Sequence, residues 1–137
     1  MSIIKTCNIK YSYDRKRIVL NNISVEFDLG KIYAILGPSG CGKTTLLSLL
    51  GGLDSPSDGQ VLFQGEDIEK KGLAWHRKNN VAFIFQSYNL IDYMTPAENV
   101  ALTSKLPPFP VLERLGLTKE QSRQNILNLS GEKKQRE

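Results

Sequence analysis

The sequence has 137 residues and a formal net charge of +4, which is enough chain for one ordinary domain and no more. Hydrophobic residues make up 40% and charged residues 23%, a balance that excludes a disordered or fibrous protein. No apolar run approaches the roughly 20 residues that a membrane helix needs. The sequence also has no basic stripe with interleaved aromatic residues of the kind that indicates nucleic-acid binding. The two cysteines lie far apart and the single histidine cannot complete a zinc site, so we expect reduced thiols in a cytosolic protein.

Strand patterns dominate the N-terminal part of the chain. Alternating apolar residues predict strands at 3–13 and 18–27, with a polar turn between them and a candidate kink in the second strand at Asn21 and Asn22. The apolar run at 32–36 predicts a short buried strand. Residues 43–50 then predict a helix with inward leucines, which Gly51 and Gly52 end.

The C-terminal part mixes strands and helices. A turn at 54–59 leads to a predicted strand at 60–63 and a short helix at 72–78. The continuous apolar run at 81–85 (VAFIF) predicts a strand buried on both faces. Further helices are expected from Thr95, at 111–115 and from Thr118 to about residue 127, with a proline-rich break at 107–110.

Glycines mark the segment that follows the predicted strand at 32–36. Residues 37–44 (GPSGCGKT) fit the pattern G-x-x-x-x-G-K-[ST]. Such glycines let backbone N–H groups surround an anion, and the following helix aims its N-terminal N–H groups at the same phosphates. Lys43 can then reach the β- and γ-phosphates, and the Thr44 hydroxyl can coordinate Mg²⁺. The sequence therefore predicts a site for ATP with Mg²⁺ and an α/β fold with a largely parallel sheet. The candidate residues of this loop are Gly37, Ser39, Gly40, Cys41, Gly42, Lys43, Thr44 and Thr45.

The loop GPSGCGKTTLL resembles the Walker A motif of ABC-type ATPases, the nucleotide-binding subunits of ATP-binding cassette transporters. VAFIFQ at 81–86 resembles the family's strand that ends in the Q-loop glutamine, and TPAENV at 95–100 resembles the segment after it. LSG at 129–131, with Gln135 and Arg136, resembles the signature motif, so the resemblance covers nearly the whole chain. The stretches LLGGLDSPSDG and FIFQSYNLIDYMTPAENVAL most resemble the subgroup of lipoprotein-release, macrolide-export and antimicrobial-peptide-resistance transporters.

The resemblance implies a P-loop NTPase sheet with helices on both faces. It also implies an N-terminal antiparallel β subdomain at 1–30, a P-loop core at 31–86, and a shortened helical subdomain with the signature at 87–137.

The resemblance also implies roles for single residues. Tyr13 matches the A-loop aromatic ring that stacks on adenine, with Tyr11 as a rival in the same stretch. Gln86 would contact Mg²⁺ and the attacking water, and Lys43 and Gln86 are the candidate catalytic residues. Thr45 would touch the α-phosphate. A structural interpretation also stays open for three of these positions. Tyr13 would be a strand-end tyrosine, Gln86 a polar strand terminus and Thr45 a local helix cap.

The signature-like segment carries a departure from the family pattern. Ser130 and Gly131 would contact the γ-phosphate of ATP held by an opposite subunit, although Ser130 also suits a helix cap. Glu132 stands where the family has a second glycine, and a carboxylate sits badly beside a triphosphate. His76 comes before Gln86, so it cannot be the family's switch histidine, and we interpret it as a surface residue.

The chain ends at Glu137, directly after the signature-like segment, so the family's Walker B strand and switch histidine cannot be assigned. We therefore expect a truncated chain in which 32–36 or 81–85 has an open apolar edge. The stretch between Gln86 and Ser130 is also short for the family by roughly ten residues.

The leading hypothesis is the ATP-binding subunit of an ABC transporter. Two nucleotide-binding domains, identical or different, would close on two ATP molecules and drive transmembrane permease subunits. The chain would then lie in the cytoplasm, on the inner face of the membrane through its partner. Two alternatives stay open: a truncated remnant that binds nucleotide without hydrolysing it, and another P-loop ATPase. Whether the chain itself is an ATPase is left open, because the Walker B residues are not in it.

Overall fold

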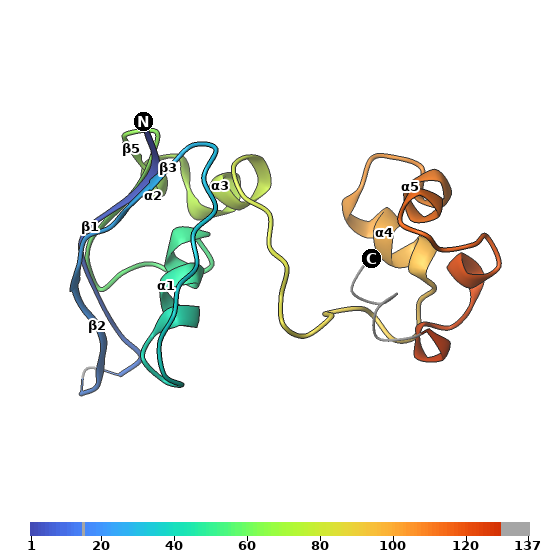
Figure 1. The fold of residues 1–137 in the computed structure, drawn as a ribbon, viewed down its shortest axis with the longest axis horizontal. Coiled ribbons are helices and arrows are strands. Elements are labelled where there is room, and N and C mark those ends of the chain that lie inside the picture. Colours follow the sequence, from blue (N-terminus) through green and yellow to red (C-terminus); the bar gives the residue numbers. More distant parts are fainter. Residues whose placement is uncertain (15, 130–137) are drawn as a thin grey trace. The chain divides into compact units, whose positions relative to one another are not determined.

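The computed structural model describes residues 1–14 and 16–129. The chain divides into two compact units, Met1–Phe83 and Ile84–Glu137, each with its own hydrophobic core (Figure 1). The three-part division predicted from the sequence stays a prediction.

The first unit contains an antiparallel sheet built around its longest strand, β1, so the prediction of a largely parallel sheet was wrong for the described residues. Strand β1 pairs with β2, β3 and β4, and β4 also pairs with β5. The strands are β1 (Ser2–Ser12), β2 (Ile18–Ile23), β3 (Glu26–Asp28), β4 (Asp58–Phe63) and β5 (Glu66–Asp67).

The strand predicted at 18–27 is divided into β2 and β3 by a break that Thr6 of β1 fills. The Thr6 hydroxyl donates to the carbonyl of Ile23 (3.1 Å) and accepts from the backbone N–H of Val25 (3.0 Å). Thr6 is fully buried, and its hydroxyl bonds to the two backbone groups, at Ile23 and Val25, that border the break in the strand. The predicted strand is therefore interrupted between Ile23 and Glu26, just after the candidate kink, where Asn22 has a φ of 55°.

Helix α1 (Lys43–Leu50) lies beside the sheet in Figure 1, and its Leu46, Leu49 and Leu50 are buried in the core of this unit. Leu47, also predicted to face inward, is 51% exposed. Leu49 of the helix and Ile9 of β1 are fully buried, and each such side chain contributes about 1.5–3 kcal/mol. This packing fixes α1, and with it the glycine loop that enters the helix. The buried members of this core are Ile9, Leu20, Leu46, Leu49, Leu50, Val61 and Ile68.

His76 lies in this core and not on the surface. It belongs to α3 (Leu73–Asn79), which follows α2 (Ile68–Lys71), and it is only 1% exposed. Its Nε2 lies 3.1 Å from the carbonyl oxygen of Leu50, and its Nδ1 lies 3.0 Å from the amide nitrogen of Asn80. The interpretation of His76 as a surface residue was wrong, because both ring nitrogens find partners that allow its burial.

Two segments predicted as strands, 32–36 and 81–85, have no regular secondary structure. Ile32 is 101% exposed, Leu36 is 88% exposed and Ile84 is 87% exposed, although Ile35 packs against the core. A strand needs a neighbouring backbone to pair with, and the sheet of the described residues includes neither segment. An apolar run indicates a tendency to be buried, but it does not supply the partner strand, so both strand predictions were wrong.

The second unit is built from short helices around a small core. Its core residues are Ala97, Leu112, Leu117 and Leu129, with Val100 and Phe109 packed against them. The elements are α4 (Pro96–Thr103), α5 (Pro108–Arg114) and two 3-10 turns, η1 (Gln121–Arg123) and η2 (Ile126–Asn128).

Two predictions for this unit need correction. The prolines predicted to break the chain instead begin α5, because the first helical N–H groups have no partner within the helix and Pro108 and Pro110 therefore lose no bond there. The helix predicted from Thr118 is two 3-10 turns. Gln124 between them is extended, which interrupts the helix.

The predicted helix start at Thr95 is confirmed, including its capping box. The Thr95 hydroxyl accepts from the Glu98 N–H (3.2 Å), and the Glu98 carboxylate accepts from the Thr95 N–H (2.7 Å). Hydrogen bonds to the Glu98 carboxylate, first from the Thr95 backbone N–H and then from the Thr95 side chain, hold the pKa of Glu98 below its ordinary value. Their contribution to stability is therefore full above the ordinary carboxyl range and is lost as the pH falls through the lowered pKa.

We expect Thr95→Ala to lower the free energy of unfolding of the second unit by about 1 kcal/mol, because the cap satisfies an otherwise unpaired N–H. Hydrogen exchange of the Glu98 amide in the full chain measures the effect. Thr103→Ala, at the exposed far end of α4, is the control. Equal protection of the Glu98 amide in the two variants would show that the cap contributes nothing.

No helix in the described parts of the chain is long and apolar enough to cross a membrane.

Candidate functional site

The glycine loop between residue 36 and α1 depends on Gly42, which caps the helix. Gly42 has a φ of 98°, and its carbonyl accepts the first helical hydrogen bond, from Leu46 N–H (2.8 Å). A Cβ at Gly42 would meet Leu20 Cδ2 at 2.8 Å and the Val19 carbonyl oxygen at 3.2 Å. Only glycine suits both this backbone conformation and this approach to β2.

Lys43 directs its ammonium into the loop. Its Nζ donates to the carbonyl oxygens of Gly37 (2.6 Å) and Pro38 (2.7 Å), and Cys41 Sγ lies 3.7 Å away. An ammonium has three N–H donors, and sulfur is a weak acceptor. A phosphate oxygen can therefore replace the thiol as the third partner while both carbonyls stay bound.

A cavity of about 540 Å³ opens beside this loop. The described residues that line it include two cations, Lys43 and Arg17, and no carboxylate, which favours an anionic ligand. Thr44 is exposed at the start of α1, where the helix N–H groups point outward. These residues fit a nucleoside triphosphate. The lining residues are Tyr13, Arg17, Val19, Ser39, Gly40, Gly42, Lys43, Thr44 and Thr45.

The two tyrosines that compete as the adenine-stacking ring have different surroundings. Tyr13 lines the loop cavity, is 74% exposed, and places its hydroxyl 2.9 Å from Thr45 Oγ1. Tyr11 does not line that cavity, and its hydroxyl donates to the carboxylate of Asp54. The geometry favours Tyr13, because a base needs a free ring face. The bond between the hydroxyl groups of Tyr13 and Thr45 also gives the buried Thr45 hydroxyl a structural partner.

Sequence reasoning missed Arg17 and Val19 as residues of this cavity. The Asp14 carboxylate accepts from the backbone N–H groups of Lys16 (3.2 Å) and Arg17 (2.9 Å), which shapes the turn before β2. This turn places Arg17 at the cavity, four residues after Tyr13. The signal in the sequence was the aspartate at the start of a short polar turn, a residue that commonly bonds to nearby backbone.

A family model describing ABC transporters matches residues 20–137, which is most of the chain. The chain belongs to the ABC transporter family. YclH of Bacillus subtilis (strain 168), an uncharacterized ABC transporter ATP-binding protein, is 37% identical over 147 residues, which cover 99% of this chain and 65% of YclH. The bacitracin export ATP-binding protein BceA of Halalkalibacterium halodurans is 38% identical over 116 residues, which cover 80% of this chain and 46% of BceA.

A solved ABC cassette has the same fold as this chain. MJ0796, in a dimeric post-hydrolysis state bound to ADP and Pi, superposes with a TM-score of 0.78 and 26% sequence identity over 97% of this chain and 66% of that chain. The likeness confirms the predicted α/β class of the P-loop NTPases. The chain spans about two thirds of the length of MJ0796 and of YclH.

The YclH alignment bears on the predicted shortening of this ABC transporter chain. It extends over 147 residues, whereas the chain has 137. At least ten positions of the alignment therefore have a residue in YclH and none here. Their location is not given by the alignment length, so the shortening between Gln86 and Ser130 stays a prediction.

The remaining predicted site residues of this ABC transporter chain lie outside the first unit. Gln86 is an exposed residue of the second unit, so its contact with Mg²⁺ stays a prediction. Ser130 and Gly131 lie outside the described residues, as does Glu132. Within residues 1–14 and 16–129, no group of three or more His, Cys, Asp or Glu side chains could hold a metal ion. Coordination of Mg²⁺ by Thr44 stays a prediction.

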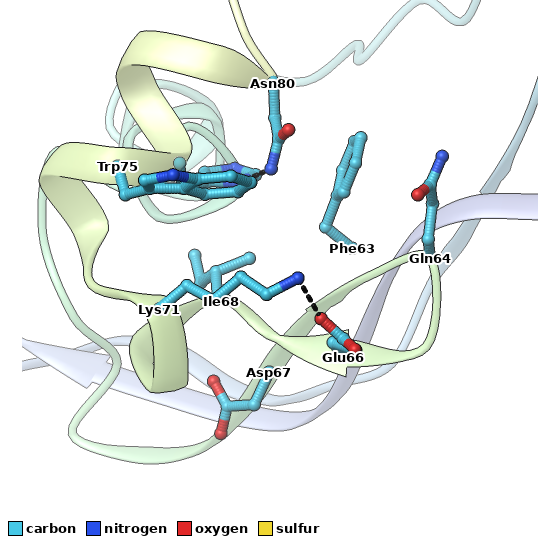
Figure 2. Close-up of a pocket in the computed structure, with 9 residues that line it drawn as sticks. Phe63, Gln64, Glu66, Asp67, Ile68, Lys71, Trp75 and Asn80 are labelled. Carbon is cyan, nitrogen blue, oxygen red and sulfur yellow. Dashed lines mark hydrogen bonds and ion pairs between the residues drawn. The ribbon is translucent and has the colours of Figure 1, made fainter.

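A second cavity lies between β4, β5, α2 and α3, away from the phosphate loop (Figure 2). Figure 2 shows Lys71 extended toward Glu66, with which it forms an ion pair (2.5 Å), below the ring of Trp75. The Lys71 ammonium also lies 5.3 Å from the centre of that ring. The pair lowers the pKa of Glu66. Because these charged groups already have partners, we interpret this cavity as structural.

Proposed function

We propose that this chain binds ATP with Mg²⁺ on the loop from Gly37 to Thr45 and serves as the nucleotide-binding subunit of an ABC transporter. The observation that carries the proposal is one cavity that brings together the Lys43 ammonium, the N-terminus of α1 and the exposed ring of Tyr13. These groups suit a triphosphate at one end and a base at the other.

The loop residues and Tyr13 have proposed roles that their positions in the first unit support. The loop N–H groups and Lys43 bind the β- and γ-phosphates, and Thr45 binds near the α-phosphate. Tyr13 stacks on the base. Bound Mg²⁺ neutralises charge on the phosphates, and the Thr44 hydroxyl is its ligand in the first unit. In the proposed function Gln86 contributes a ligand to the ion and orients the attacking water.

We propose that a second nucleotide-binding domain and transmembrane permease subunits complete the transporter. Ser130 and Gly131 would then face the γ-phosphate of the opposite subunit. MJ0796 was solved as a dimer, and CbiO1 of Clostridium perfringens, another solved relative, is part of the transporter complex cbiONQ. The chain would lie on the cytoplasmic face of the membrane and couple ATP binding and hydrolysis to transport.

Within the family, we propose the subgroup of lipoprotein-release, macrolide-export and antimicrobial-peptide-resistance transporters. The relative BceA, a bacitracin export protein, supports this assignment. The sulfate/thiosulfate import protein CysA of Pseudomonas syringae pv. tomato is 47% identical over 89 residues, which cover 65% of this chain and 26% of CysA. That shorter match covers less of the chain than the BceA match does.

Cys41 provides a direct test of nucleotide binding, because its thiol is exposed within the phosphate loop. We expect MgATP to protect Cys41 from alkylation in the full chain, while Cys7 on β1 is labelled at an unchanged rate. Equal labelling of Cys41 with and without MgATP would refute binding at this loop. Release of inorganic phosphate, measured in parallel, separates hydrolysis from binding without turnover.

A further inference from the structure

Two contacts hold the ring of Tyr13 in place. The ring of Tyr11 meets it edge to face, with centroids 5.1 Å apart and an angle of 88° between the planes. At the other end, the hydroxyl groups of Tyr13 and Thr45 are 2.9 Å apart. The ring is therefore oriented even though Tyr13 is largely exposed.

Tyr11 is itself held by Asp54, whose carboxylate accepts a hydrogen bond from the Tyr11 hydroxyl. Asp54 follows the chain reversal that ends α1, where Leu53 N–H donates to the Ser48 carbonyl (2.9 Å). Its other carboxylate oxygen accepts from Ser55 N–H (2.8 Å). Helix α1 thus carries the phosphate loop at its N-terminus and, through Asp54 and Tyr11, the aromatic ring at its C-terminus.

The space around Tyr13 makes this support necessary. A third cavity, of about 200 Å³, is lined by residues of β1 and of the end of α1, among them Tyr11, Leu49 and Asp54. Tyr13 and Thr45 line this cavity as well as the loop cavity, so the Tyr13 ring borders open space in addition to the phosphate loop. A Tyr13 ring without the support of Tyr11 has room to turn away from the loop cavity.

We propose that Tyr11 and Asp54 are positioning residues that orient Tyr13 and thereby contribute the part of the nucleotide affinity that depends on the base. The inference rests on the proposed function, since it assigns a role within the same ATP site. Neither residue lines the phosphate loop, so each acts on the ligand only through Tyr13.

The test compares two ligands, MgATP and magnesium tripolyphosphate, which lacks the base, by calorimetric titration of the full chain. We expect Tyr11→Phe and Asp54→Ala each to weaken MgATP binding about fivefold, the value of one ordinary hydrogen bond, and to leave tripolyphosphate binding unchanged. The double variant should be no weaker than either single variant. Asp54→Asn keeps an acceptor oxygen and should restore most of the affinity.

Two control variants set the scale. Tyr13→Ala removes the stacking ring itself and should weaken MgATP binding about tenfold, again without effect on tripolyphosphate. Asp58→Ala removes an exposed carboxylate at the start of β4, whose ion pair is with Lys10, and should change neither affinity. An equal loss for both ligands, or no loss for MgATP, in the Tyr11 and Asp54 variants would overturn the inference. A wild-type chain that binds neither ligand would refute the proposed function instead.

A titration without nucleotide tests the Tyr11–Asp54 pair by itself. The hydrogen bond to Asp54 raises the pKa of Tyr11 to about 12. The bond is therefore present below the ordinary tyrosine pKa of about 10 and is lost as the pH rises through about 12. The phenolate absorbance, taken as the difference between wild type and Tyr11→Phe, should show Tyr11 ionising at a pH of about 12. In Asp54→Ala it should return to about 10, and an unchanged step would overturn the pairing.

Discussion

Replacing Lys43 by alanine should weaken MgATP binding by about ten- to a hundredfold. The ammonium is held inside the loop by the carbonyls of Gly37 and Pro38, so its charge is already placed where the phosphates arrive. A hydrogen bond to a charged group contributes about 1.5–3 kcal/mol, and each 1.4 kcal/mol changes the affinity tenfold. Calorimetric titration of the full chain with MgATP measures the loss.

The control for this substitution is Lys31→Ala, which removes the same charge from the same unit. Lys31 is exposed and pairs with Asp28 at 2.8 Å, away from the loop cavity. A surface pair of this kind contributes at most about 1 kcal/mol to stability and should not change nucleotide affinity. If Lys43→Ala binds MgATP as tightly as Lys31→Ala does, the ammonium has no part in the site and the proposed ligand is wrong.

Local signals in the sequence were sufficient for the parts of the site that lie close together along the chain. The glycine pattern places the turn, the cap and Lys43 within eight residues, and the structure joins these residues by bonds between near neighbours. The capping box at Thr95 has the same character, since its two residues are three positions apart. Such features depend on backbone chemistry that a short segment carries by itself.

The predictions that failed depend on contacts with distant residues. His76 is buried because the Leu50 carbonyl, 26 residues away, accepts at one ring nitrogen, and no local pattern announces that partner. The strands predicted at 32–36 and 81–85 have the right apolar composition, but pairing is a property of two segments. Arg17 reaches the phosphate cavity through a turn whose direction only the folded sheet defines.

Gly59→Ala should lower the free energy of unfolding of the first unit by about 2–4 kcal/mol. Gly59 has a φ of +84°, which costs an L-residue about 1–2 kcal/mol. A Cβ there would also lie 2.5 Å from the Cys7 carbonyl oxygen and 2.6 Å from the Asn8 carbonyl oxygen. These are backbone atoms of the paired strand β1, so relief of the clash requires the β1–β4 ladder itself to move.

Gly65→Ala separates the two causes. Gly65 has nearly the same φ, +82°, and lies in the turn between β4 and β5, but a Cβ there would meet nothing within 4 Å. It therefore carries the conformational cost alone, which the reduced entropy of the unfolded chain offsets by about 0.4–1 kcal/mol. Trp75 is the only tryptophan and lies in α3 of this unit, so its fluorescence in a urea titration reports both variants. An equal loss of unfolding free energy in the two variants would mean that β1 and β4 move apart at Gly59 at no measurable cost. A loss larger in Gly59→Ala by about 1–3 kcal/mol would show that the close approach of β1 and β4 is rigid. That rigidity matters for the site, because β1 ends at Ser12, next to Tyr13.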